Sequence, residues 1–105
     1  MRTPEKALSV NGVPIRLGNE RWRHIVENHI ELAGHFYDVL ETVESPEFVV
    51  KGHQDELIAV KRFDDGKYLL VVYKEVADND GFIITAFFTS RIEQVKKRGI
   101  LWKRD

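Results

Sequence analysis

The pattern of apolar and polar residues changes its period near residue 47. Before that point, apolar residues recur at the three- and four-residue spacing of an amphipathic helix. Residues from Glu20 to about Leu32 predict one helix, with Asn19 as its N-cap and Gly34 at its end. Residues from about His35 to Glu44 predict a second helix, which stops at Ser45-Pro46 because proline disfavours helix in the residue before it.

After residue 47, the chain has the pattern of short strands separated by turns. Val, Ile, Tyr, Phe and Thr are enriched, and Gly, Asp and Asn separate the apolar runs. The connections are too short for a parallel crossover, so neighbouring strands are expected to be antiparallel. The predicted strands are Phe48–Lys51, Leu57–Phe63, Tyr68–Val76 and Phe82–Thr89. The expected fold is α+β, with two N-terminal helices packed on a four-stranded antiparallel meander.

Two further elements flank this core. Val13–Leu17 alternates apolar with polar residues and predicts an edge strand entered through the Asn11-Gly12 turn. Arg91–Gly99 predicts a short last helix capped by Ser90, after which residues 100–102 dock back on the fold. A chain of 105 residues fits a single domain, so residues 1–105 are expected to form one unit.

Strand alternation divides the predicted sheet into two faces. Lys61, Tyr73 and Thr85 are expected to converge on one face, which would suit an extended anion. The plain alternative is that Tyr and Thr are simply favoured in strands and that Lys61 is a solvated lysine. The opposite face is expected to form the core with the helices, through Trp22, Ile25, Val39, Leu40, Ile58, Val60, Leu70, Val72, Ile84 and Ala86.

Two histidines, His24 and His29, fall in the first predicted helix. Their separation of five residues places them roughly 140° apart around the helix, whereas a spacing of four would put two metal ligands on one face. No metal and no cofactor are therefore expected. Histidine has an ordinary pKa of about 6.5, which suits proton transfer near neutral pH. The histidines form a candidate acid–base set with Lys61, Tyr73 and Thr85.

Composition excludes several classes of protein. Hydrophobic residues are 43% and charged residues 31% of the chain, which is typical of a folded domain rather than a disordered one. The absence of cysteine excludes a disulfide framework and favours a reducing compartment. No segment has the length and apolarity of a membrane span, and the N-terminus leads into no apolar signal core. A cytoplasmic protein with no membrane partner is expected.

Charge is distributed unevenly along the chain. The net charge is −1, but six cations against two acids give residues 91–105 a charge of +4 and leave −5 on the rest. A basic segment on an acidic body favours one surface that binds a polyanion, although a charge run is more often a solvated helix.

The chain contains four short motifs, which are RWRHIVENHIEL at 21–32, SPEFV at 45–49, YLLVVY at 68–73 and ITAF at 84–87. Together they resemble motifs of the phage-type nucleases of the barnase, EndoU, colicin and RelE (BECR) superfamily. The resemblance covers roughly residues 19–91 and implies helices followed by a four-stranded antiparallel sheet. It also implies a metal-independent endoribonuclease, in which the 2′-hydroxyl of RNA attacks the adjacent phosphate and leaves a cyclic phosphate.

The resemblance assigns positions to individual residues. His24 and His29 match the helix histidines of the superfamily, Lys61 a basic strand position, and Thr85 the hydroxyl before alanine in the last strand. Such helices often have His-Pro-Glu where this chain has His29-Ile30-Glu31. The helix is therefore expected to continue past His29 and to aim its ring differently.

In-line cleavage requires a base, an acid and groups that stabilise charge on the phosphate. We expect one histidine to serve as base or acid, Lys61 to contact the phosphate and Thr85 to donate a hydrogen bond. Tyr73 is expected to stack on a base or to handle a proton. The residues expected to bind flanking substrate are Arg62, Thr89 and Arg91.

Three function classes remain open: a ribonuclease, a non-catalytic RNA-binding or regulatory module, and a protein-interaction domain. RNA is the expected partner in the first two classes. If the protein is a nuclease toxin, the resemblance also implies a neutralising antitoxin or immunity protein. Four aromatic residues would stack on bases in the second class and bury an interface in the third, namely Phe82, Phe87, Phe88 and Trp102.

Overall fold

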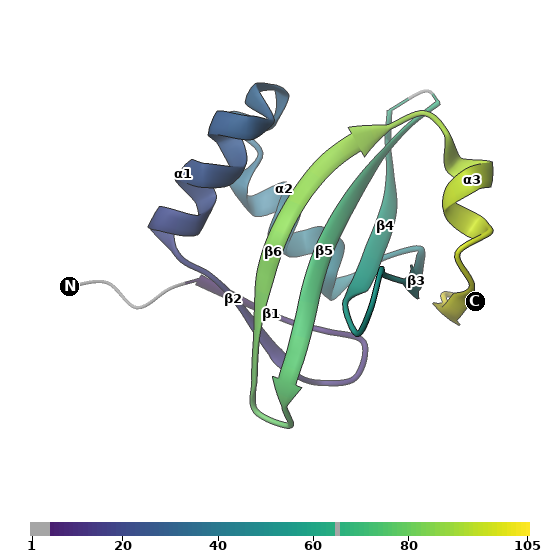
Figure 1. Cartoon of the computed structure of the whole chain (residues 1–105), viewed down its shortest axis with the longest axis horizontal. Coiled ribbons are helices and arrows are strands. Elements are labelled where there is room, and N and C mark those ends of the chain that lie inside the picture. The colour runs from purple at the N-terminus through teal and green to yellow at the C-terminus, as the bar shows by residue number, and fades with distance from the viewer. Residues whose placement is uncertain (1–4, 65) are drawn as a thin grey trace.

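The computed structural model describes residues 5–64 and 66–105, which form a seven-stranded mixed sheet, three α-helices and one 3-10 helix (Figure 1). No helix within these residues is long and apolar enough to cross a membrane. In chain order the elements are β1 (Glu5–Leu8), β2 (Pro14–Leu17), α1 (Asn19–Asn28), η1 (Ile30–Leu32), α2 (Phe36–Glu44), β3 (Phe48–Lys51), β4 (Leu57–Asp64), β5 (Lys67–Ala77), β6 (Asp80–Thr89), α3 (Ile92–Lys96) and β7 (Ile100–Lys103).

The sheet is larger than the predicted one, so the expectation of two helices on a four-stranded antiparallel meander is wrong. The strand order is β1-β2-β6-β5-β4-β3-β7. The four predicted strands pair antiparallel in chain order, but β1, β2 and β7 extend the sheet at its two ends. β2 pairs with β6 in parallel, with Ile15 opposite Gly81, and is therefore internal rather than an edge strand. Strand alternation gives no information about such pairings between distant segments.

The pairing of β2 with β6 depends on a glycine. A Cβ atom at Gly81 would lie 2.5 Å from Cδ1 of Ile15 and 2.6 Å from the carbonyl oxygen of Lys74. Both distances are too short for any side chain, so glycine allows β2 and β5 to approach β6 from both sides at this point.

The first helix is shorter than predicted. Its N-cap is Gly18, and it ends at Asn28 because His29 leaves the helical conformation, with φ −137° and ψ 76°. The 3-10 turn η1 then carries the chain toward α2 and buries Leu32 completely. The helix therefore does not continue past His29.

Two apolar cores lie on opposite faces of the sheet. We call the sheet face covered by α1, η1 and α2 the helix face, and the other the α3 face; Figure 1 shows these helices on the two sides of the sheet. The helix-face core includes Ile25, Leu32, Val39, Val43, Val71 and Tyr73. The α3-face core consists of Phe48, Val50, Ile58, Val60, Leu70 and Val95.

The predicted core is only partly correct, because the two faces of β4 and β5 are exchanged. Val60 is buried in the α3-face core, and Val72 packs against that core instead of facing α1 and α2. Ile84 is half-buried and lies where the register of β6 against β5 shifts. Apolar residues cover both faces of these strands, so alternation did not indicate which face meets the helices. Trp22, Ile25, Val39, Leu40 and Ala86 do contribute to the helix-face core.

Candidate functional site

The structure separates the three sheet residues that were predicted to converge. Lys61 lies opposite Leu69, and both belong to the helix face, as does Tyr73. Thr85 lies opposite Val72 on the α3 face. The reason is the register shift in β6, which places one extra residue between positions 83 and 85 and so changes the face on which Thr85 lies. The predicted convergence of Lys61, Tyr73 and Thr85 is therefore wrong.

Lys61 already has an anionic partner on the helix face. Its Nζ lies 3.0 Å from Oε1 of Glu41, which belongs to α2. The ammonium group is thus paired with a helix that covers the sheet, on the opposite side from Thr85.

Tyr73 is part of the core. Its side chain is fully buried, and among the residues that the structure describes its hydroxyl has no hydrogen-bond partner. Burial, and to a lesser extent the charge of Glu75, raises the pKa of the Tyr73 phenol far above neutrality. In this position the ring cannot stack on a base, and the phenol is not suited to proton transfer near pH 7.

A pocket of about 200 Å³ lies on the α3 face between the end of β6 and α3. Two predicted substrate-binding residues, Thr89 and Arg91, line it, and Oγ1 of Thr89 accepts a 3.1 Å hydrogen bond from the backbone N–H of Arg91. Arg98 adds a second cation, and its Nε donates a 3.0 Å hydrogen bond to the carbonyl oxygen of Lys51. We call this the β6–α3 pocket; its lining is Ile58, Leu70, Phe87, Thr89, Arg91, Gln94, Val95 and Arg98.

Phe87 links the β6–α3 pocket to the end of α1. Its ring centroid lies 5.9 Å from that of His29, and the planes are 31° apart. The side chain of His29 is 33% exposed, and its Nδ1 lies 3.7 Å from Oε2 of Glu31. The structure therefore brings His29 against one residue of the pocket lining, Phe87, although His29 itself does not line the pocket. The side chain of His24 is 57% exposed on α1, where its Nδ1 is 3.7 Å from Oε1 of Glu27.

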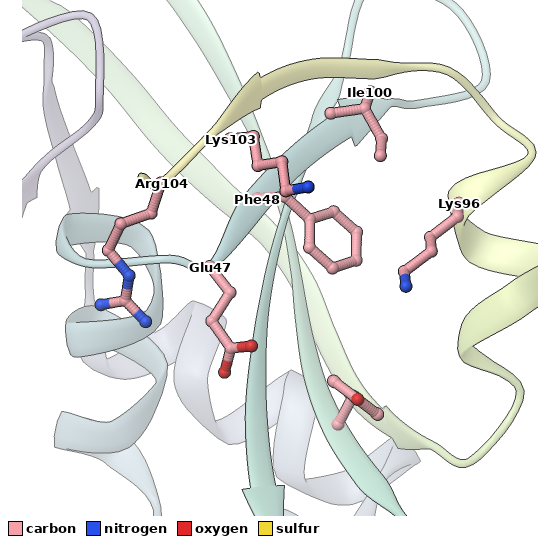
Figure 2. Close-up of a pocket in the computed structure, with 7 residues that line it drawn as sticks. Glu47, Phe48, Lys96, Ile100, Lys103 and Arg104 are labelled. Atoms are coloured by element: carbon pink, nitrogen blue, oxygen red, sulfur yellow. The ribbon is translucent and has the colours of Figure 1, made fainter.

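A second pocket, of about 430 Å³, lies between α3 and the β3–β7 edge of the sheet. Figure 2 shows the Phe48 ring between the side chains of Lys96 and Lys103. The Nζ of Lys96 lies 6.0 Å from the centroid of that ring, and Phe48 pairs with Lys103 across the two strands. The third predicted substrate-binding residue, Arg62, lies opposite Tyr68. We call this the β7–α3 pocket; its lining is Glu47, Phe48, Tyr68, Lys96, Ile100, Lys103 and Arg104.

The basic C-terminal segment surrounds both pockets. Of its six cations, all except Lys97 line one pocket or the other. The charge asymmetry of the sequence indicated this surface. Only the structure shows that β7 pairs with β3 and folds the segment back onto the α3 face. Sequence reasoning did not single out Arg98, Lys96, Lys103 or Arg104 as ligand-binding residues.

His35 has the shortest contact to a carboxylate of the four histidines. Its Nδ1 lies 2.8 Å from Oδ2 of Asp38, and its ring meets Phe63 and Phe88 edge-on at 5.1 and 5.6 Å. His35 is the N-cap residue of α2, and Asp38 lies in the first turn of that helix. The pair is therefore accounted for by the start of α2, on the helix face and away from both pockets.

Among residues 5–64 and 66–105, no three His, Asp or Glu side chains are grouped as ligands for a metal ion. Comparison of the chain with protein-family models, curated proteins and solved structures found no match. Function is therefore inferred from the residues and their arrangement.

Proposed function

We propose that the protein is a metal-independent endoribonuclease whose RNA substrate lies on the α3 face at the β6–α3 pocket. The observation that carries the proposal is the contact between His29 and Phe87. This contact joins a histidine at the end of α1 to a ring that lines the pocket together with Thr89 and Arg91. The resemblance of the α1 and β6 motifs to BECR nucleases supports the same activity. We also place the protein in the cytoplasm, where RNA is available to it.

The reaction needs two proton transfers. A base removes the proton of the 2′-hydroxyl, the O2′–P bond forms, the P–O5′ bond breaks, and an acid protonates the departing 5′-oxygen. The products are a 2′,3′-cyclic phosphate and a 5′-hydroxyl end. We assign one of these transfers to His29 and the other to Glu31, whose carboxylate lies 3.7 Å from the Nδ1 of His29.

The remaining groups of the pocket bind and stabilise the phosphate. Arg91 and Arg98 supply positive charge close to the negative charge that develops on phosphorus. The hydroxyl of Thr89, which already accepts a bond from the Arg91 N–H, still has its own proton to donate. Phe87 offers a ring on which a base can stack beside His29.

The test is cleavage of a mixed RNA substrate by purified protein in excess EDTA, with analysis of the product ends. We expect 2′,3′-cyclic phosphates, and we expect His29→Ala to lower the rate by about 10²- to 10⁴-fold. His24→Ala is the matched control, because it removes a histidine from α1, which ends just before His29, without changing the pocket. Equal loss of activity in both variants, or full activity of His29→Ala, would contradict the assignment.

A second candidate function is RNA binding without cleavage. The observation that favours it is the β7–α3 pocket, which combines three cations with two aromatic rings and contains no histidine. Salt-dependent retention of intact RNA by the wild-type protein would support this function instead. If the nuclease is a toxin, we propose a neutralising protein as its partner, and an acidic surface on that protein would match the basic α3 face.

A further inference from the structure

We propose that the β7–α3 pocket binds a nucleoside monophosphate, present either as a free nucleotide or as the phosphorylated end of an RNA. With the phosphorylated end of an RNA as the ligand, the inference rests on the proposed function, because the pocket then binds the end of the nuclease substrate.

The pocket is formed by an irregularity in the pairing of β3 with β7. Phe48 lies opposite Lys103, but Val50 lies opposite Ile100, because the register shifts between positions 49 and 50. Without the shift, Val50 would face Leu101, and Ile100 would fall on the opposite side of the strand. The bulge therefore places Ile100 and Lys103 on the same face, where both line the pocket. β-Bulges are over-represented at sheet edges and next to active sites, where they redirect a side chain in this way.

The charge of the lining matches a terminal phosphate. Lys96, Lys103 and Arg104 face one carboxylate, that of Glu47, which leaves a charge of +2. Glu47 is already engaged, since its Oε2 accepts a 2.7 Å hydrogen bond from the backbone N–H of Arg62. A phosphate monoester carries about −1.5 to −2 at pH 7, whereas an internal phosphodiester of RNA carries a single charge. The pocket should therefore prefer a terminal phosphate to an internal one.

The cations of the pocket have few competing partners. Within the described residues, no carboxylate forms an ion pair with Lys103 or Arg104. Lys96 has Glu93 at 3.8 Å, but the side chain of Glu93 is 81% exposed, so this contact is weak and easily exchanged. An incoming anion would thus gain three charged contacts without breaking a strong ion pair.

The size and aromatic content of the pocket match a nucleoside. Its volume of about 430 Å³ falls within the range of small-molecule sites, roughly 300 to 1,000 Å³. The half-buried ring of Tyr68 lies in the lining and offers a surface on which a base can stack. Aliphatic contact from Ile100 completes an environment that a phosphate alone would not use.

The experiment is calorimetric titration of the full-length protein with AMP, UMP, adenosine and inorganic phosphate. A second arm compares the 5′-phosphorylated and 5′-hydroxyl forms of one DNA oligonucleotide, which lacks the 2′-hydroxyl and so cannot be cleaved. We expect AMP and UMP to bind more tightly than adenosine or phosphate. Lys103→Ala and, independently, Lys96→Gln should each weaken AMP binding by about 10-fold. Lys97→Ala is the matched control, since Lys97 is an adjacent cation outside both pockets.

Tighter binding of the mononucleotides that is lost in both pocket variants supports the site, and a preference for the 5′-phosphorylated oligonucleotide assigns the RNA end as a source of the ligand. Equal affinity for adenosine and AMP, equal affinity for phosphate and AMP, or equal weakening by Lys97→Ala would overturn the inference. Its failure is distinguishable from failure of the proposed function. If His29→Ala abolishes cleavage and the protein does not bind AMP, the nuclease proposal holds and the nucleotide site is wrong. If the protein binds AMP but cleaves no RNA, the nucleotide site holds and the nuclease proposal is wrong.

Discussion

Ser9 and Glu75 lie far apart in the chain, but Oγ of Ser9 donates a 2.6 Å hydrogen bond to Oε2 of Glu75. Nδ2 of Asn11 contacts both oxygens of the same carboxylate, at 3.1 and 3.2 Å. These bonds connect the turn between β1 and β2 to β5, although β5 is not a neighbour of either strand in the sheet. The N-terminal hairpin is therefore fixed to the central strands by side chains as well as by the pairing of β2 with β6.

The first prediction concerns this connection. Ser9 is only 5% exposed, and its Oγ also accepts a hydrogen bond from the backbone N–H of Val13 at 3.2 Å. Ser9→Ala removes the hydrogen-bond partner of the buried Val13 N–H and one of the partners of the half-buried Glu75 carboxylate, and is expected to lower the free energy of unfolding by about 1–3 kcal/mol. Urea denaturation measures the change, with Ser90→Ala, an exposed serine before α3, as the control. Equal stability of the two variants would show that the hydroxyl contributes little.

The second prediction concerns the unpaired hydroxyl of Tyr73. A buried polar group without a partner has a desolvation cost that nothing offsets, so Tyr73→Phe is expected to leave stability unchanged or to raise it by about 1 kcal/mol. The rate of RNA cleavage should stay at the wild-type value, because the phenol is enclosed in the helix-face core. Thermal unfolding and the cleavage assay are measured on the same preparation. A large loss of activity at constant stability would restore Tyr73 as a catalytic candidate.

Sequence patterns located five of the seven strands, β2 to β6, but missed β1 and β7 and did not indicate the pairing partners or the faces. The predicted limits of β3 to β6 are close to the observed ones, because turn residues mark both ends of each strand. Pairing of β2 with β6 and of β7 with β3 joins segments that are distant in the chain, and local periodicity contains no signal for it. The sequence also gives no signal for the register shift near Ile84, although this shift determines the sheet face on which Thr85 lies.

The residues of the candidate site show the same difference between what local sequence predicts and what depends on distant segments. Thr89 and Arg91 are neighbours in the chain, so their proximity in the β6–α3 pocket follows from local structure. Lys61 and Tyr73 were assigned to a site through the orientation of whole strands, and the exchange of the two sheet faces removed both from it. Residues close in sequence were thus placed reliably, whereas those that depend on tertiary packing were not.

The third prediction is a pH dependence of stability. Nε and Nη2 of Arg16 donate hydrogen bonds of 2.8 and 3.0 Å to the two carboxylate oxygens of Asp80, and this interaction lowers the pKa of Asp80 below its ordinary value of 3.8. A carboxyl whose pKa is lowered by folding stabilises the protein above its unfolded-state pKa. That contribution disappears as the pH falls through the lowered value.

The melting temperatures of wild type and Asp80→Asn should therefore differ by a constant amount above about pH 5, and the difference should close as the pH falls through the lowered pKa of Asp80. Asp78→Asn, which removes a carboxylate from the same turn without touching the Arg16 interaction, serves as the control. A difference that widens on acidification would mean that the Arg16 interaction does not stabilise the folded state.

The fourth prediction separates the two faces of the sheet by their response to salt. Arg91 lines the β6–α3 pocket, whereas Lys61 is paired with Glu41 on the helix face. If single-stranded nucleic acid lies on the α3 face, Arg91→Ala removes one phosphate contact and should reduce the slope of log affinity against log salt concentration by about 0.7. Lys61→Ala removes the same charge from the protein but no phosphate contact, so the slope should be unchanged. Fluorescence anisotropy with an uncleavable DNA oligonucleotide measures both slopes. Equal reductions would show that overall charge, rather than a bound strand on the α3 face, determines the affinity.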